Sequence, residues 1–219
     1  MKQDLIHKVA RNKRRQKARE AILKAAAYNF AAYGFAGARM DKIAIDASVN
    51  KAMLYYHIGD KSELYKQALK RVAGEIADQV LANIPKTENP EQAFKIYVST
   101  IVKNIFSSKF LTPIILRELA DKGKNMPDEV IEQIARIISV LRSILDKGER
   151  EGVFRKVNLP LLQMLIAGGV NFIAAGRPTM KKAVKLMASA HNQPKNETPE
   201  EISEFISGIL VNGLKTRQG

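Results

Sequence analysis

Apolar residues recur at spacings of three and four along nearly the whole chain, and no strong alternating stretch interrupts them. This spacing is the period of an amphipathic helix, whereas a half-buried strand alternates every second residue. We therefore predict an all-α fold. The length of 219 residues is enough for one medium domain or two small ones.

The first third of the chain predicts four helices separated by short breaks. The first helix carries an apolar stripe made of Ile22, Ala26, Phe30 and Tyr33. Gly34 is expected to end it, because glycine commonly terminates helices. A short helix is predicted at 40–47, another begins near the N-cap residue Asn50, and a longer one spans 61–83.

The rest of the chain predicts five or six more helices, after a break at 85–90 that has proline at both ends. Thr112 is expected to cap a helix that opens with proline. Pro127 opens a long amphipathic helix, and 161–175 is apolar almost all round, as in a helix buried on more than one side. Thr198 begins a capping box that opens the last helix.

Net charge narrows the class of partner. The chain has 36 lysines and arginines against 22 aspartates and glutamates, a formal net charge of +14. Residues 1–76 hold 16 of the basic and 7 of the acidic side chains, so they have a net charge of +9 and the remainder only +5. Such a balance indicates a polyanionic partner or an anionic surface.

Missing residue types and motifs exclude several function classes. A chain without cysteine has no disulfides, thiolate metal ligands or cysteine nucleophile, which suits a reducing cytoplasm. No uninterrupted apolar run approaches the length of about 18 residues that a membrane span needs. The common nucleotide-loop, nucleophile-elbow and zinc-protease motifs are absent. We therefore expect a cytoplasmic protein that is not an enzyme and needs no metal or cofactor.

Residues 40–58 predict two helices joined by a tight turn. Val49 fills the space between the helices, and Leu54 and Ile58, four residues apart, pack inward from the second helix. The outward face of the second helix is left with Lys51, Met53, Tyr56 and His57. A basic, hydrogen-bonding face at a helix N-terminus is what reading of the DNA major groove requires.

These residues resemble the N-terminal domain of TetR-family transcriptional repressors. The resemblance covers about residues 16–76 and rests on Gly34, Ala38, Ile43, Ala44, Val49, Leu54, Tyr55, Tyr56, His57, Lys61 and Leu64. It implies a basic N-terminal arm at 1–15, a three-helix helix-turn-helix DNA-binding domain at 16–76 with the motif at about 39–58, and a C-terminal helical effector-binding and dimerisation domain at 77–219. It also implies a homodimeric repressor that binds a palindromic operator in double-stranded DNA and is released by a small-molecule effector, a case of ligand-induced allostery.

The resemblance assigns DNA contacts to eight residues of this chain. Lys51, Met53 and Tyr56 are expected to reach bases or the adjacent backbone. Phosphate contacts are expected of Arg39, Tyr55, His57 and Lys61. Ala52 stands where glycine is frequent in the family, and its small side chain still lets the backbone approach a phosphate.

The C-terminal part predicts an effector cavity, because 90–175 hold more large apolar side chains than one stripe per helix requires. The expected apolar lining is Phe94, Tyr97, Ile101, Phe106, Leu116, Ile138, Leu141 and Phe172. Polar orientation is expected from Asn104, Gln133 and Asn171. The favoured effector is a mainly apolar or amphipathic molecule, although the stripe at 94–106 also fits an ordinary helix core.

Two glycine-containing apolar helices, at 161–175 and 202–214, are the expected dimer surface. They predict a four-helix bundle with two helices from each subunit. The expected interface residues are Leu161, Leu165, Gly168, Phe172, Phe205, Ile206, Ile209 and Gly213.

Several alternatives stay open. The basic N-terminal segment has two interpretations. It forms the charged first turns of helix one or a solvated tail, or it is a flexible arm that contacts phosphate or the minor groove. The Tyr55 side chain is consistent with a place in the core and with a contact to phosphate. Arg117 and Glu118 fit an ion pair better than a ligand clamp. The alternative function is a helical binding protein for RNA or for an acidic protein, without base-specific readout.

Overall fold

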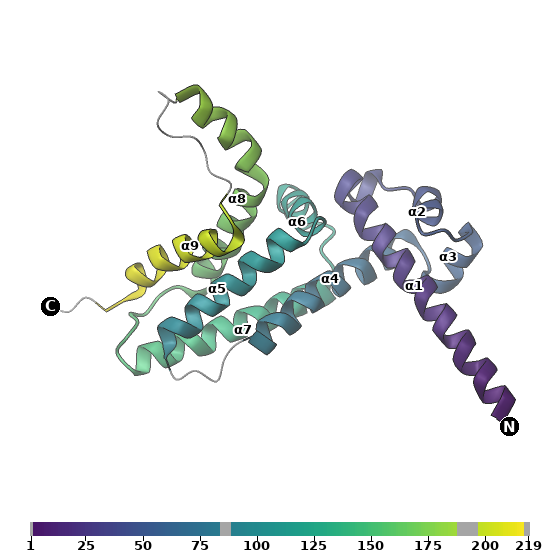
Figure 1. The fold of residues 1–219 in the computed structure, drawn as a ribbon, viewed down its shortest axis with the longest axis horizontal. Helices are drawn as coiled ribbons and strands as arrows, with labels where there is room; N and C mark the ends of the chain where they lie inside the picture. Colours follow the sequence, from purple (N-terminus) through teal and green to yellow (C-terminus); the bar gives the residue numbers. More distant parts are fainter. Residues whose placement is uncertain (1, 84–88, 188–196, 217–219) are drawn as a thin grey trace. The chain divides into compact units, whose positions relative to one another are not determined.

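The computed structural model describes residues 2–83, 89–187 and 197–216, and every regular element in these ranges is a helix (Figure 1). The helices are α1 (Lys2–Gly37), α2 (Met40–Asp46), α3 (Lys51–Ile58), α4 (Lys61–Asn83), α5 (Pro90–Ser107), α6 (Leu111–Ala120), α7 (Asp128–Arg150), α8 (Leu159–Met187) and α9 (Pro199–Leu214). The predicted all-α fold is confirmed.

Local capping explains why most predicted helix ends were right. The Asn50 side chain accepts a hydrogen bond from the Met53 N–H at 2.7 Å, which begins α3. At α9, Thr198 and Glu201 form the expected capping box. Gly34 interrupts the helical backbone of α1 with φ +71°, in the left-handed region that glycine adopts without strain.

One predicted helix start is wrong, and one predicted break lies largely outside the described residues. The capping role assigned to Thr112 is wrong, because α6 already begins at Leu111 and its N–H donates to the Ser108 hydroxyl at 3.1 Å. Of the predicted break at 85–90, positions 85–88 lie outside the described residues. Asn89 caps α5 by accepting from the N–H groups of its first turn.

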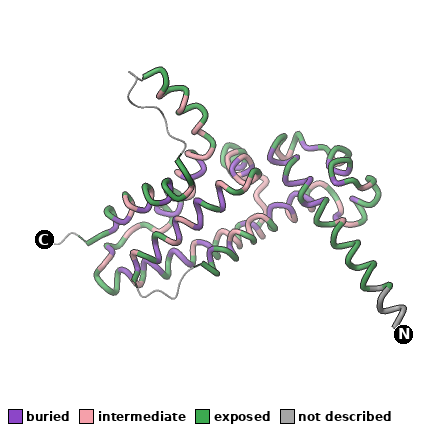
Figure 2. The backbone as a smooth tube through the Cα atoms, in the orientation of Figure 1, coloured by how far each residue is buried: buried purple, intermediate pink, exposed green. Residues whose placement is uncertain are grey.

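Contacts divide the chain into two compact units. Unit 1 comprises Met1–Val72 and Pro113–Val130, and unit 2 comprises Ala73–Thr112 and Ile131–Gly219. Unit 1 therefore holds α1, α2, α3, the first part of α4 and nearly all of α6. Figure 2 shows that each unit has its own set of buried residues.

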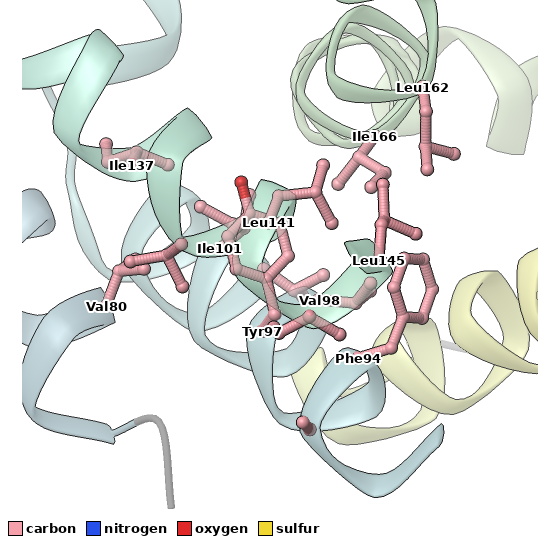
Figure 3. Packing of buried hydrophobic residues seen from close by; sticks show 14 of the residues in the cluster. Val80, Phe94, Tyr97, Val98, Ile101, Ile137, Leu141, Leu145, Leu162 and Ile166 are labelled. Atoms are coloured by element: carbon pink, nitrogen blue, oxygen red, sulfur yellow. The ribbon is translucent and has the colours of Figure 1, made fainter. Parts of the chain in front are cut away.

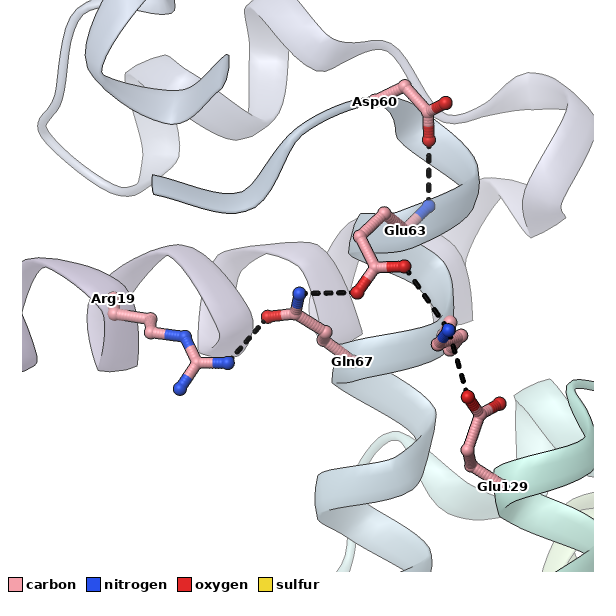
Figure 4. A network of polar contacts seen from close by, with 6 residues as sticks. Arg19, Asp60, Glu63, Gln67 and Glu129 are labelled. Atoms are coloured by element: carbon pink, nitrogen blue, oxygen red, sulfur yellow. Dashed lines mark hydrogen bonds and ion pairs between the residues drawn. The ribbon is translucent and has the colours of Figure 1, made fainter. Parts of the chain in front are cut away.

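The core of unit 1 is built where α1, α2, α3 and α4 bring apolar side chains together. Its fully buried members include Ile22, Phe30, Ile43, Leu54 and Leu64. Outside this core, a chain of polar contacts between exposed and partly exposed side chains links α1, α4 and Glu129 (Figure 4). In that chain Arg19 of α1 donates to Gln67 of α4 at 2.8 Å, and Lys66 of α4 pairs with Glu129 at 2.8 Å.

The core of unit 2 forms where α5 packs against α8 and α9, with α7 contributing its apolar stripe. Figure 3 shows the central side chains, among them Phe94, Tyr97, Val98, Leu141 and Ile166. The buried Tyr97 hydroxyl donates to the Gln163 side chain at 2.5 Å. Burial raises the pKa of Tyr97, so this phenol stays a neutral donor.

By length and composition α8 alone among the described helices is apolar enough to cross a membrane. Polar residues such as Gln163 and Asn171 interrupt its apolar stretch, so α8 contains no long uninterrupted apolar run. In unit 2, Leu162, Ile166 and Val170 on one side of α8 pack into the core. Some of the apolar side chains of α8 are therefore buried in the core, and the others are exposed on the surface of unit 2.

Candidate nucleic-acid interface

The turn between α2 and α3 sets the direction of α3. The helix α2 ends at Asp46, and the N–H of the next residue, Ala47, donates to the Ile43 carbonyl. Ser48 then adopts φ +57°, and the Val49 N–H reaches back to the Ala44 carbonyl at 3.0 Å. The left-handed conformation costs a non-glycine residue about 1 kcal/mol. It lets the chain reverse within three residues and start α3 at once.

The orientation of α3 agrees with the sequence pattern. Leu54 and Ile58 are buried against the rest of unit 1. The opposite face leaves Lys51, Ala52, Met53, Tyr55 and Tyr56 exposed, with Tyr56 at 75%. Tyr55 thus lies outside the core, and His57 is partly buried. The structure therefore brings six of the eight predicted DNA-contact residues together on or beside one helix.

Lys51 at the start of α3 is held by an ion pair. Its ammonium lies 2.7 Å from the Asp41 carboxylate of α2. Lys51 lowers the pKa of Asp41, and Asp41 raises the pKa of Lys51, so both groups stay charged near neutral pH. Both side chains are more than half exposed. An exposed pair of this kind contributes little stability, so the ammonium is available to exchange Asp41 for a phosphate.

Lys61, a predicted phosphate contact, already has two neighbours in the protein. Its ammonium donates to the Ala36 carbonyl at 3.0 Å and lies 5.1 Å from the centre of the Phe35 ring. It therefore ties the start of α4 to the last turn of α1, after Gly34, a role that the sequence pattern did not reveal. An ammonium has three N–H groups, so donors remain for a phosphate. Arg39, the last of the eight, is exposed immediately before α2.

The basic N-terminal segment is helical from Lys2 and continuous with α1. This agrees with its interpretation as the charged first turns of helix one. Its exposed basic side chains include Arg11, Lys13, Arg14, Arg15 and Lys17, whereas the side chains of residues 2–6 and 8 lie outside the described ones. The Arg15 guanidinium lies 5.8 Å from the centre of the Tyr56 ring. This contact, which sequence reasoning missed, joins the basic turns to the outward face of α3.

The predicted effector residues are not gathered at one site. In unit 2, Phe94, Tyr97, Ile101, Asn104, Leu141 and Asn171 are buried, whereas Phe106, Gln133 and Ile138 are partly buried. Leu116 belongs to unit 1, on α6. Phe172 is 71% exposed, so its ring lies on the surface of unit 2 and not in a lining. Within the described residues the buried Asn171 Oδ1 has no hydrogen-bond partner, which leaves this polar acceptor available inside the unit.

The predicted dimer residues lie mostly on an apolar surface of α8 and α9. Leu161, Leu165, Phe172, Phe205 and Ile209 are all exposed, and so are Gly168 and Gly213. A Cβ added at either glycine would meet only open space. Ile206 differs because it is partly buried against the core. Met164, which the sequence analysis did not select, joins this exposed surface.

The expected ion pair of Arg117 and Glu118 is wrong. Arg117 donates to the Ala32 carbonyl at 2.9 Å. Glu118 is buried and accepts a hydrogen bond from the Tyr65 hydroxyl. Adjacent residues on a helix point in different directions, so these two side chains reach different partners within unit 1.

Two parts of the chain match models of known protein families. Residues 22–68 match the model of bacterial regulatory proteins of the tetR family, and residues 90–198 match the tetracyclin repressor-like C-terminal domain. The HTH-type transcriptional repressor NicS of Pseudomonas putida is 24% identical over 200 residues, which cover 90% of this chain and 92% of the relative.

Solved structures share the fold. The hemolysin II transcriptional regulator HlyIIR superposes with a TM-score of 0.64 at 22% identity, over 93% of this chain and 99% of that one. The transcriptional regulator FadR from Bacillus subtilis, in complex with stearoyl-CoA, has a TM-score of 0.70 at 16% identity, over 89% and 98% of the two chains.

Proposed function

The chain belongs to the TetR family of bacterial DNA-binding transcriptional regulators, and from this premise we propose that it represses transcription as a homodimer on a palindromic operator. The exposed face of α3 carries the proposal, because it combines a basic helix start with Tyr56 projecting into solvent. The relatives are regulators, which agrees with the expectation that the chain is not an enzyme.

Two copies are needed for specificity. A helix as short as α3 reaches only a few base edges, and genomic selectivity requires two half-sites about one helical turn apart or more. The exposed apolar side chains of α8 and α9 offer a surface that a second copy buries with twofold symmetry. A four-helix bundle across that axis accounts for the large exposed rings there.

We propose further that a small apolar or amphipathic effector releases the operator. FadR, a structural neighbour, holds the amphipathic stearoyl-CoA, and the unpartnered Asn171 Oδ1 offers one internal polar contact in unit 2. An effector lowers operator affinity only if it prefers a conformation in which the recognition helices are misplaced. The helix α4 supplies residues to both units, so it is the proposed link.

Replacing Tyr56 by alanine is expected to reduce sequence discrimination. If Tyr56 makes a good base contact, its loss costs about 1–3 kcal/mol of discrimination, so the ratio of operator to random-duplex affinity falls by roughly fivefold to 150-fold. The operator is first selected from a random duplex library with the wild-type protein, and affinities are then measured by fluorescence anisotropy. An unchanged ratio would assign base reading to Met53 and Lys51 instead.

Replacing Lys51 by alanine is expected to weaken binding to operator and random duplex alike. The slope of log affinity against log salt concentration is negative, and loss of one phosphate contact makes it shallower by about one. Lys185→Ala is the matched control, because Lys185 is also an exposed basic residue but lies on α8. If both variants change the slope equally, the effect reports net charge and not a contact of α3.

A further inference from the structure

Unit 1 contains a pocket of about 370 Å³ that the DNA interface does not use. It is lined by the end of α1 and the segment that follows Gly34, by α4, and by α6 with the turn that follows it. Its most informative lining residues are Phe30, Tyr33, Phe35, Tyr65, Glu118 and Arg117. None of the lining comes from α3. The volume is large enough for a small organic molecule.

Glu118 is a buried carboxylate with no cationic partner among the residues that the structure describes. It is 3% exposed, and it accepts hydrogen bonds from the Tyr65 hydroxyl and, at 3.3 Å, from the Asn125 N–H. Within the described ranges no lysine or arginine nitrogen lies within 4.0 Å of it. Buried charges are normally paired, because an unpaired one loses the hydration that stabilises it. The carboxylate therefore favours a positively charged group in the pocket.

Aromatic rings surround the same space. The Tyr65 ring meets Phe30 edge-on at 4.7 Å and Phe35 at 5.0 Å between ring centres. Tyr33 adds a ring that is 53% exposed and therefore reachable from solvent. Aromatic faces attract cations through their quadrupole. The Phe35 ring already does so for the Lys61 ammonium, 5.1 Å from its centre.

The basic residues of the lining do not neutralise Glu118. The Arg117 guanidinium is held by the Ala32 carbonyl at 2.9 Å. Lys124 and Asp121 are both exposed, so water and salt screen their opposite charges. The buried carboxylate therefore decides the electrostatic preference of the interior.

We propose that this pocket binds a small organic monocation that carries an apolar group. The cationic head lies against Glu118 and the ring of Tyr33, and the apolar group lies against the rings of Phe35 and Tyr65. The site is additional to the effector cavity proposed for unit 2. An occupant contacts Phe35 and Ala36, a few residues before α2 begins at Met40, so it also stabilises unit 1 against unfolding.

Isothermal titration calorimetry on the full chain, without DNA, tests the proposal. The probe is benzyltrimethylammonium, with benzyl alcohol as the neutral and benzoate as the anionic comparator. The cation is expected to bind about tenfold or more tightly than either comparator. Because DNA is absent, the result stands whether or not the proposed repressor function is correct.

Variants locate the probe. Glu118→Gln keeps an acceptor for Tyr65 and the side-chain shape but removes the charge, so it is expected to lose about tenfold or more in cation affinity. Glu132→Gln, an exposed change on α7 outside the pocket, leaves affinity unchanged. Tyr33→Leu keeps an apolar side chain but removes the ring, and it weakens the cation about threefold with little effect on benzyl alcohol.

A thermal melt of each variant shows whether it is folded. If Glu118→Gln does not fold, the cation affinity of the Tyr33→Leu variant alone tests whether the cation binds in this pocket. Three results overturn the proposal: no cation binding at millimolar concentration, equal affinity for the cation and benzyl alcohol, or wild-type cation affinity in a folded Glu118→Gln or, failing that, in Tyr33→Leu.

Discussion

A glutamate at Ile209 is expected to convert the proposed dimer into monomers and to remove tight operator binding. Ile209 is 57% exposed on α9, beside Phe205 and in the same unit as the exposed side chains of α8. A twofold interface would bury two such carboxylates without partners, and each costs several kcal/mol. Operator affinity then falls by about a thousandfold, toward the non-specific level. Light scattering at micromolar concentration measures the mass, and anisotropy measures the affinity.

Ile131→Glu is the matched control for this prediction. Ile131 is also a large exposed apolar residue of unit 2, but it lies on α7 rather than on α8 or α9. The control is expected to stay dimeric and to bind the operator normally. A wild-type chain that is monomeric at micromolar concentration contradicts the proposed assembly, and so does an Ile209→Glu protein that remains a dimer.

Alanine at Gly148 is expected to destabilise the protein by about 2 kcal/mol or more, although the same change inside most helices stabilises by up to about 1 kcal/mol. A Cβ at this position would lie 2.1 Å from Cδ2 of the Phe154 ring. That ring is buried and meets Phe94 edge-on at 6.2 Å. The ring has to move within a packed core, so overpacking outweighs the gain in helix propensity. Urea unfolding followed by circular dichroism measures the change.

Gly74→Ala supplies the contrast. Gly74 lies inside α4, and a Cβ there meets only the end of the Gln133 side chain at 3.9 Å, an ordinary contact. This variant is expected to gain about 0.5–1 kcal/mol. If Gly148→Ala is as stable as Gly74→Ala, the Phe154 ring does not pack against Gly148 of α7.

The helices and most of their ends followed from the sequence because the interactions that define them are local. Apolar side chains three and four residues apart share one face of a helix, and caps such as Asn50 and Thr198 bond to a backbone N–H three residues away. The outward face of α3 followed from the same geometry once Leu54 and Ile58 were assigned to the core. The cap predicted at Thr112 failed because Ser108 competes for the same helix start.

The sequence by itself therefore determined an all-α chain with a helix-turn-helix and a basic recognition face. Only the tertiary structure decided which distant groups meet. It turned Arg117 toward Ala32, and it buried Glu118 beside Tyr65, which is 53 residues away in the chain, with no cation of the described residues as its partner. It also exposed Phe172 on α8. Such contacts depend on how helices pack, and a helical period shows which residues share a face but not what that face will meet.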